Sequence, residues 1–207
     1  MAGTSSVLED QSFLSRMDRK LLRLEYIFAL ASGLAVFSLM FLAVISVSGR
    51  HTINQPLPGY VDWIEQLMPL IAFMGVAFVQ RNGGHIRMDI VVSLLRGRAL
   101  WFFEALSVFL MFFVVVMVTW GAWAHFDRSF DFAAPLWSRD SSMDIALPIW
   151  PAKLLAPVAF SVLAVRLLVQ FAIYTRAFVQ NDFTPAGVPM IEDAATQASN
   201  EAKTVSG

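Results

Sequence analysis

Four stretches of the sequence are almost entirely apolar, and the shorter segments between them hold the charged and turn-forming residues. No charged residue occurs from Tyr26 to Val47, from Gln66 to Gln80 or from Ala105 to Ala124. A transmembrane helix needs about 20 consecutive, mostly apolar residues to cross a hydrocarbon core of about 30 Å. The pattern therefore predicts an all-α integral membrane protein with four transmembrane helices. Their expected ranges are about residues 24–48, 60–81, 100–124 and 148–174.

The fourth span is less uniform than the others. From Ile145 to Thr175 the only charged residues are Lys153 and Arg166, and the segment opens with Pro148, Trp150 and Pro151. A lysine near a span end can extend its ammonium group to the headgroup region. We therefore expect this span to begin near Trp150.

The segment between the second and third spans has a helical period of its own. Asp89, Ser93 and Arg96 recur at helical spacing, while most of the other positions are apolar. This predicts a short amphipathic surface helix at about residues 85–97. The polar segments 1–23 and 178–207 are expected to be an N-terminal tail and a disordered C-terminal tail.

Lysine and arginine are unevenly distributed among the segments next to the spans. The N-terminal flank and the second connection are rich in them, whereas the first and third connections hold few. Cytoplasmic segments of membrane proteins carry an excess of these residues. Both termini are therefore expected in the cytoplasm. The residues counted are Arg16, Arg19, Lys20 and Arg23 before the first span, Arg50 in the first connection, Arg81, Arg87, Arg96 and Arg98 in the second, and Arg128 and Arg139 in the third.

Composition agrees with a membrane protein and excludes several functions. Hydrophobic residues make up 57% of the chain and charged residues 15%, which is more apolar than a soluble domain. The net charge of −1 and the lack of a basic run interleaved with aromatics argue against nucleic-acid binding. Without cysteine, the chain has no disulfide, thiolate metal site or cysteine nucleophile.

No catalytic motif is present, which leaves non-enzymatic membrane functions. A haem-binding anchor subunit of a membrane oxidoreductase is one alternative, but its histidines should face each other within the bundle. His51, His85 and His125 all lie near predicted span ends. A self-sufficient four-span carrier or channel is another, yet the first and third spans offer few hydroxyls in their central turns, such as Ser38, Ser46 and Thr119.

Several short segments carry a resemblance to a known family. They are Trp63-Ile64-Glu65, the run from Ala72 to Ala77 with Gly75 in mid-span, the run from Arg81 to Asp89, and Leu147 to Trp150 followed by Pro157. From about Leu24 to Ala177 the chain resembles the small membrane subunit (small permease, Q-type) of tripartite ATP-independent periplasmic (TRAP) transporters. It departs from that family at Gly84, where an acidic residue is common.

The resemblance implies a small scaffold subunit in the bacterial inner membrane, with no enzymatic activity and no cofactor. Its partners would be a large multi-span transport subunit, which moves substrate and sodium, and a periplasmic substrate-binding protein, which delivers organic acids. The small subunit would carry no substrate itself. Candidate interface or structural residues are Asp62, Glu65, Arg81, Gly84, His85, Arg87, Asp89 and Trp150.

Two ionic contacts are expected. Glu104 and Arg166 should lie at similar depth and form an intramembrane charge pair, because an isolated charge within a span costs about 2.5–3.5 kcal/mol; Glu25 is the alternative partner of Arg166. Asp89 should lie within reach of Arg81 or Arg87, across the turn at Gly83 and Gly84. That corner would hold the surface helix at a fixed angle for the large subunit to contact.

Overall fold

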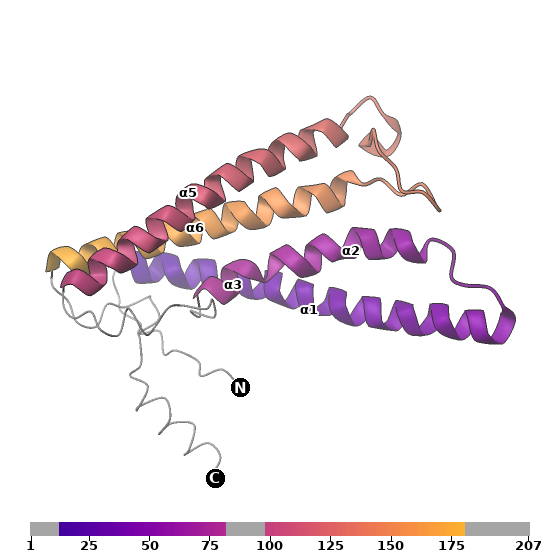
Figure 1. Cartoon of the computed structure of the whole chain (residues 1–207), viewed down its shortest axis with the longest axis horizontal. Coiled ribbons are helices and arrows are strands. Elements are labelled where there is room, and N and C mark those ends of the chain that lie inside the picture. Colours follow the sequence, from indigo (N-terminus) through magenta and orange to yellow (C-terminus); the bar gives the residue numbers. More distant parts are fainter. Residues whose placement is uncertain (1–12, 82–97, 181–207) are drawn as a thin grey trace, which may run out of the picture. The chain divides into compact units, whose positions relative to one another are not determined.

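The computed structural model describes residues 13–81 and 98–180. Figure 1 shows the long helices α1 (Phe13–Ile53), α2 (Tyr60–Met74), α5 (Arg98–Ser129) and α6 (Trp150–Gln180), and the short helix α3 (Val76–Arg81). The connection before α6 contains a 3-10 helix, η1 (Pro135–Trp137), and two isolated antiparallel bridges. Apart from these bridges, the described residues form no β-strand.

Four helical stretches within these residues are long and apolar enough to cross a membrane, namely Ser15–Ile53, Tyr60–Arg81, Arg98–Ser129 and Trp150–Gln180. This confirms the all-α fold with four transmembrane helices. The second stretch consists of α2 and α3, which meet at Gly75, the mid-span glycine of the sequence pattern. The fourth begins at Trp150.

The helices extend beyond the predicted spans. α1 has 41 residues and begins at Phe13, so residues 13–23 are helical although the sequence placed them in the N-terminal tail. Likewise, α6 continues to Gln180. Hydropathy locates the apolar part of a helix, whereas backbone hydrogen bonds set its ends, so helix and span have different bounds. The predicted surface helix at 85–97 and most of both tails lie outside the described residues.

The chain forms two compact units, and each gathers one end of the long helices. Unit 1 comprises Met1–Leu22, Phe78–Phe113 and Val165–Gly207, and so holds the start of α1, the end of α3, the start of α5 and the end of α6. Unit 2 comprises Arg23–Ala77 and Val114–Ala164. It holds the end of α1, all of α2, the end of α5 and the start of α6, with the connections from α1 to α2 and from α5 to α6.

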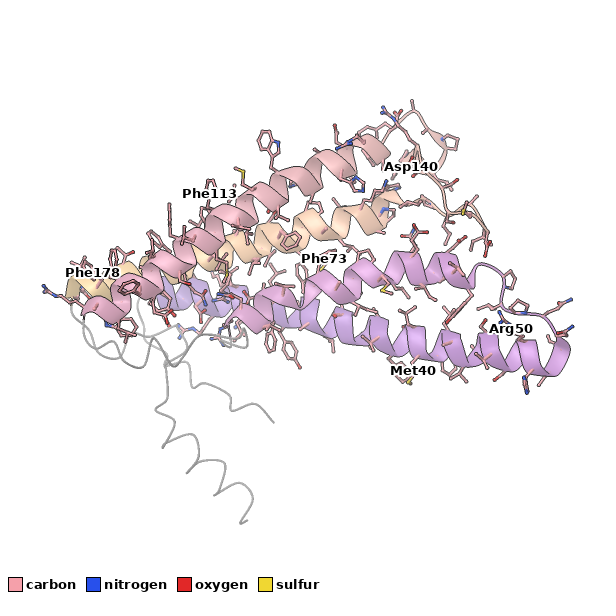
Figure 2. All side chains as sticks on the ribbon, in the orientation of Figure 1. Met40, Arg50, Phe73, Phe113, Asp140 and Phe178 are labelled. Carbon is pink, nitrogen blue, oxygen red and sulfur yellow. The ribbon has the colours of Figure 1, made fainter. Side chains whose placement is uncertain are left out.

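Each unit has a small core, and many large apolar side chains remain on its surface. In unit 1, Leu167 and Tyr174 are buried, and Trp101 stacks on Tyr174 with ring centroids 6.0 Å apart. In unit 2, Phe73 and Phe160 pack at 5.3 Å. Met40 of α1 points away from α2 and is 57% exposed (Figure 2). Exposed apolar side chains along a span are suited to contact with lipid.

Candidate functional site

A buried ionic cluster lies in unit 1, where three helices meet. Asp18 belongs to the first turns of α1, Arg81 is the last residue of α3, and Arg166 lies in the middle of α6. Nη2 of Arg81 lies 2.8 Å from Oδ2 of Asp18, and Nη1 of Arg166 donates to Oδ1 of the same carboxylate. The three residues are 1%, 7% and 0% exposed. One carboxylate therefore connects three helices that are far apart in sequence.

This cluster is sensitive to the loss of any member. Taking charged groups out of water is costly, and removing one partner of a buried pair costs about 3–5 kcal/mol because the other charge is left uncompensated. Here a single carboxylate binds two guanidinium groups, so Asp18 is the member that both others share. Asp18 is not apparent as a site residue from the sequence pattern, because it lies among basic residues before the first span.

The same face of α6 continues as a row of buried residues. Arg166, Gln170 and Tyr174 follow one another at intervals of four, which places them on one side of the helix. Gln170 accepts a hydrogen bond of 3.0 Å from Nε2 of Gln80, the neighbour of Arg81. The row attaches α6 to α3 at two successive levels, through Gln170 and through the shared carboxylate.

The polar residues of α1 have a regular spacing that marks the buried side of the helix. Asp18, Glu25, Ser32 and Ser46 are separated by multiples of seven residues, which keeps them near one face of a helix. Asp18, Glu25 and Ser46 are buried, and Ser32 donates a hydrogen bond of 3.1 Å to the carbonyl of Ile71. In a membrane helix, polar residues at such spacing identify the side that faces protein.

In unit 2, a second carboxylate holds the connection before α6. Asp62 lies in the first turn of α2 and is 2% exposed. It accepts hydrogen bonds from Oγ of Ser142 at 2.7 Å and from the backbone N–H groups of Ile145 at 2.8 Å and Asp144 at 3.2 Å. The carboxylate therefore fixes the path of the main chain at residues 142–145, a contact we call the Asp62 clamp.

Neighbouring contacts support the Asp62 clamp. Nε2 of Gln66, one turn further along α2, donates to the carbonyl of Pro148 at 2.7 Å. Gly59, which precedes α2, has a positive φ of 71° and lies directly against Ile145. A Cβ at this position would come within 2.5 Å of the Ile145 side chain, so any other residue would strain the backbone and displace Ile145.

Two further carboxylates stabilise the rest of this connection. Asp140 accepts from Nζ of Lys153 at 2.8 Å and from Oγ of Ser129 at 2.6 Å, and these bonds hold the pKa of its carboxyl below the ordinary value. The pKa of Asp131 is also lowered, mainly by the backbone N–H of Ala133 and then by Arg139. Lys153 thus has a carboxylate partner at the span end.

Trp150 anchors the connection at its C-terminal side. Its Nε1 donates a hydrogen bond of 3.0 Å to the carbonyl of Leu136. Its ring packs edge-on against Phe130 at 5.4 Å and lies 6.4 Å from Trp137. These contacts give Trp150 a structural position, while its contact with a partner remains a prediction.

The other predicted site residues divide into three groups. Glu65 is exposed on α2. Glu104 and Arg166 both lie in unit 1 and are 8% and 0% exposed, and their pairing remains a prediction. Gly84, His85, Arg87 and Asp89 lie outside the described residues, so the corner formed by Arg81 and Asp89 also remains a prediction. No group of three or more metal-ligating side chains occurs within residues 13–81 and 98–180.

Comparison with protein-family models gives a match over residues 39–176, which is more than half of the chain. The matching family is described as tripartite ATP-independent periplasmic transporters, DctQ component. No curated protein matched. The matched range includes Asp62, Arg81 and Arg166, whereas Asp18 lies before it. With four helices suited to span a membrane, this match confirms the resemblance seen in the sequence, and the chain belongs to the DctQ component family of TRAP transporters.

Proposed function

We propose that this chain is the small scaffold subunit of a sodium-coupled TRAP transporter that imports organic acids. The proposal rests on the family match, together with the pairing of the buried charges inside the protein. The carboxylate of Asp18 binds Arg81 and Arg166 across three helices, and all three side chains are buried instead of facing an open path. A site that carries substrate across a membrane needs polar groups available to the substrate near the bilayer midplane.

The proposed partners are a large multi-span transport subunit and a periplasmic substrate-binding protein. The proposed location is the bacterial inner membrane, with both termini in the cytoplasm. The distribution of basic residues supports this orientation. Unit 1, which holds both ends of the described chain, contains Arg16, Arg19, Lys20, Arg81, Arg98 and Arg176 near the helix ends. Unit 2 has fewer basic residues than unit 1, although more of its residues are described.

Reconstitution tests this function. The chain, the large subunit and the binding protein are placed in liposomes with a sodium gradient and a labelled organic acid. We expect saturable uptake from the complete system and none when either membrane subunit is omitted. Sodium-driven uptake by the small subunit alone would contradict the scaffold role. Uptake by the large subunit alone, at the rate of the complete system, would contradict it equally.

The segment that begins at Arg81 is the proposed contact with the large subunit. Because Asp18 fixes Arg81 in unit 1, the chain leaves α3 from a defined position. His85→Ala and Asp89→Asn should weaken co-purification of the large subunit without reducing membrane insertion. His51→Ala and Asp127→Asn are matched controls, since both residues are exposed at the other helix ends. If His85→Ala and Asp89→Asn assemble like the controls, the segment only sets topology.

A further inference from the structure

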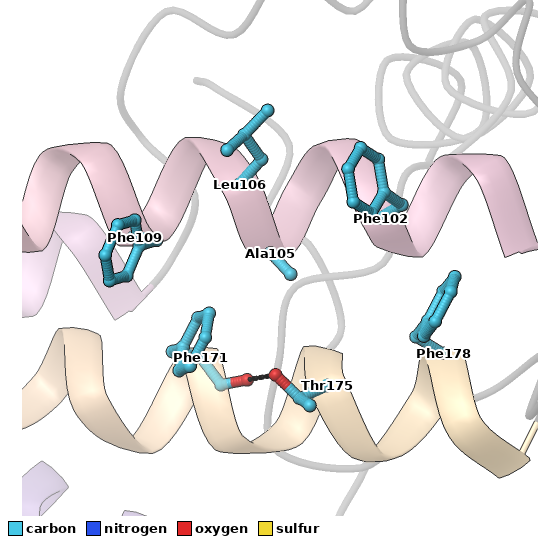
Figure 3. Close-up of a pocket in the computed structure, with 7 residues that line it drawn as sticks. All are labelled: Phe102, Ala105, Leu106, Phe109, Phe171, Thr175 and Phe178. Carbon is cyan, nitrogen blue, oxygen red and sulfur yellow. Dashed lines mark hydrogen bonds between the residues drawn. The ribbon is translucent and has the colours of Figure 1, made fainter.

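A groove lies between α5 and α6 in unit 1, on the surface of two of the spans. Its volume is about 370 Å³, within the range of about 300–1,000 Å³ typical of ligand pockets. Figure 3 shows residues of the two helices facing each other across it. Two aromatic pairs lie along it, Phe102 with Phe178 at 6.2 Å and Phe109 with Phe171 at 5.8 Å. The lining residues are Phe102, Ala105, Leu106, Phe109, Phe171, Thr175 and Phe178.

The lining side chains favour an apolar occupant. Thr175 is the only one with a polar group, and its hydroxyl donates a hydrogen bond of 2.8 Å to the carbonyl of Phe171. Phe102 and Phe109 remain 51% and 48% exposed, so the groove opens to the outside of the helix pair. On a transmembrane span that outside is lipid or another membrane protein.

A basic residue stands at one end of the groove. Arg98 is the first residue of α5 and lies one turn before Phe102, on the same helix face. Its side chain is exposed. Basic side chains at a span end attract anionic lipid headgroups.

We propose that the groove binds an acyl chain of an anionic phospholipid, whose headgroup contacts Arg98. From Phe102 to Phe109 α5 rises by about 10 Å, roughly a third of the hydrocarbon core. The groove therefore matches the part of an acyl chain next to its headgroup. The charge at one end selects anionic over zwitterionic lipid, and the aromatic walls hold the chain. This site does not depend on which substrate the transporter carries.

Photo-crosslinking at two adjacent positions tests the proposal. Phe102 and Phe103 are 51% and 50% exposed at the same depth on α5, but only Phe102 lines the groove. Each is replaced in turn by p-benzoylphenylalanine in the full chain, expressed with its large partner. The membranes contain phosphatidylethanolamine and phosphatidylglycerol. After irradiation, mass spectrometry identifies the adducts.

The adduct at position 102 should contain a larger share of phosphatidylglycerol than the membrane does, whereas the adduct at position 103 should match the membrane. Arg98→Gln should lower the enrichment at position 102 by about fivefold. Arg50→Gln, an exposed arginine at the end of α1, should leave it unchanged. Equal lipid shares at the two positions would overturn the proposal. So would an adduct with the large subunit at position 102, which would make the groove a protein interface.

Discussion

The two units are stabilised by polar contacts of different kinds. In unit 1 the carboxylate of Asp18 binds the charged side chains of Arg81 and Arg166. In unit 2 the carboxylate of Asp62 binds a hydroxyl and two backbone N–H groups. The first arrangement connects helices to one another, and the second determines the path of a loop.

The difference follows from which groups are available in each place. Arg81 and Arg166 lie on helices, where backbone N–H groups already bond to carbonyls within the same helix. Only side chains remain to connect such elements, and a buried charge then needs an opposite charge. The loop before α6 has backbone N–H groups outside helices, which require partners of their own. Asp62 supplies that partner at residues 144 and 145.

The largest effect is expected from Asp18→Asn. This change keeps the side-chain shape but removes the negative charge that two buried guanidinium groups share, at a cost of about 3–5 kcal/mol in the free energy of unfolding. Thermal unfolding of the detergent-solubilised complex measures it. Asp127→Asn, at an exposed acid on α5, is the control. Equal unfolding midpoints for the two variants would show that the cluster adds no stability.

A second effect tests the predicted pair of Glu104 and Arg166. Glu104→Arg or Arg166→Glu alone should each cost about 2.5–3.5 kcal/mol or more, because each leaves a span with an unbalanced charge. The double variant should recover folded yield, but only in part, since Arg166 also serves Asp18. Yield after detergent extraction and size-exclusion chromatography is the measurement. Losses that add independently would mean that the two residues are not paired.

A smaller and more local effect is expected in unit 2. Asp62→Ala removes the acceptor of the hydrogen bonds at residues 142–145, so the loop should open without separation of the helices. Limited proteolysis of the complex should then cleave this loop several times faster than in the wild type. Glu65→Ala, at an exposed acid of the same helix, should cleave at the wild-type rate. Identical cleavage of both variants would show that the Asp62 clamp is unnecessary.

The smallest effect concerns the pH dependence of the same loop. The folded-state pKa of Asp140 lies below its ordinary value of 3.8, chiefly because of Lys153 and Ser129. Its contribution to stability is therefore fully present above about pH 4. It is lost as the pH falls through the lowered pKa. Between pH 7 and pH 3, wild type should lose slightly more thermal stability than Asp140→Asn. The effect is small because Asp140 is 48% exposed. An unchanged pH dependence would contradict the assignment.

Some residues of the polar contacts could be identified from the sequence, whereas their partners could not. Asp62 was identified because an acid in the first turn of a span is conspicuous, but its loop partners could not be predicted, since a hydrogen bond between residues 62 and 142 depends on how the chain returns. Arg81 was identified at the end of its span. Its partner Asp18 was missed because that acid lies among basic residues in what looked like a tail.

The membrane class, the four spans and the family could all be predicted from the residues alone. These follow from apolar stretches of spanning length and from local motifs, and neither depends on which helices touch. Only the tertiary structure decided which charges meet. It brought Asp18, Arg81 and Arg166 together across distant segments, and it attached Asp62 to a loop eighty residues later in the chain. The physical reason is that a span is stabilised by its own backbone bonds and by lipid, whereas a buried charge is stabilised only by the neighbour that packing provides.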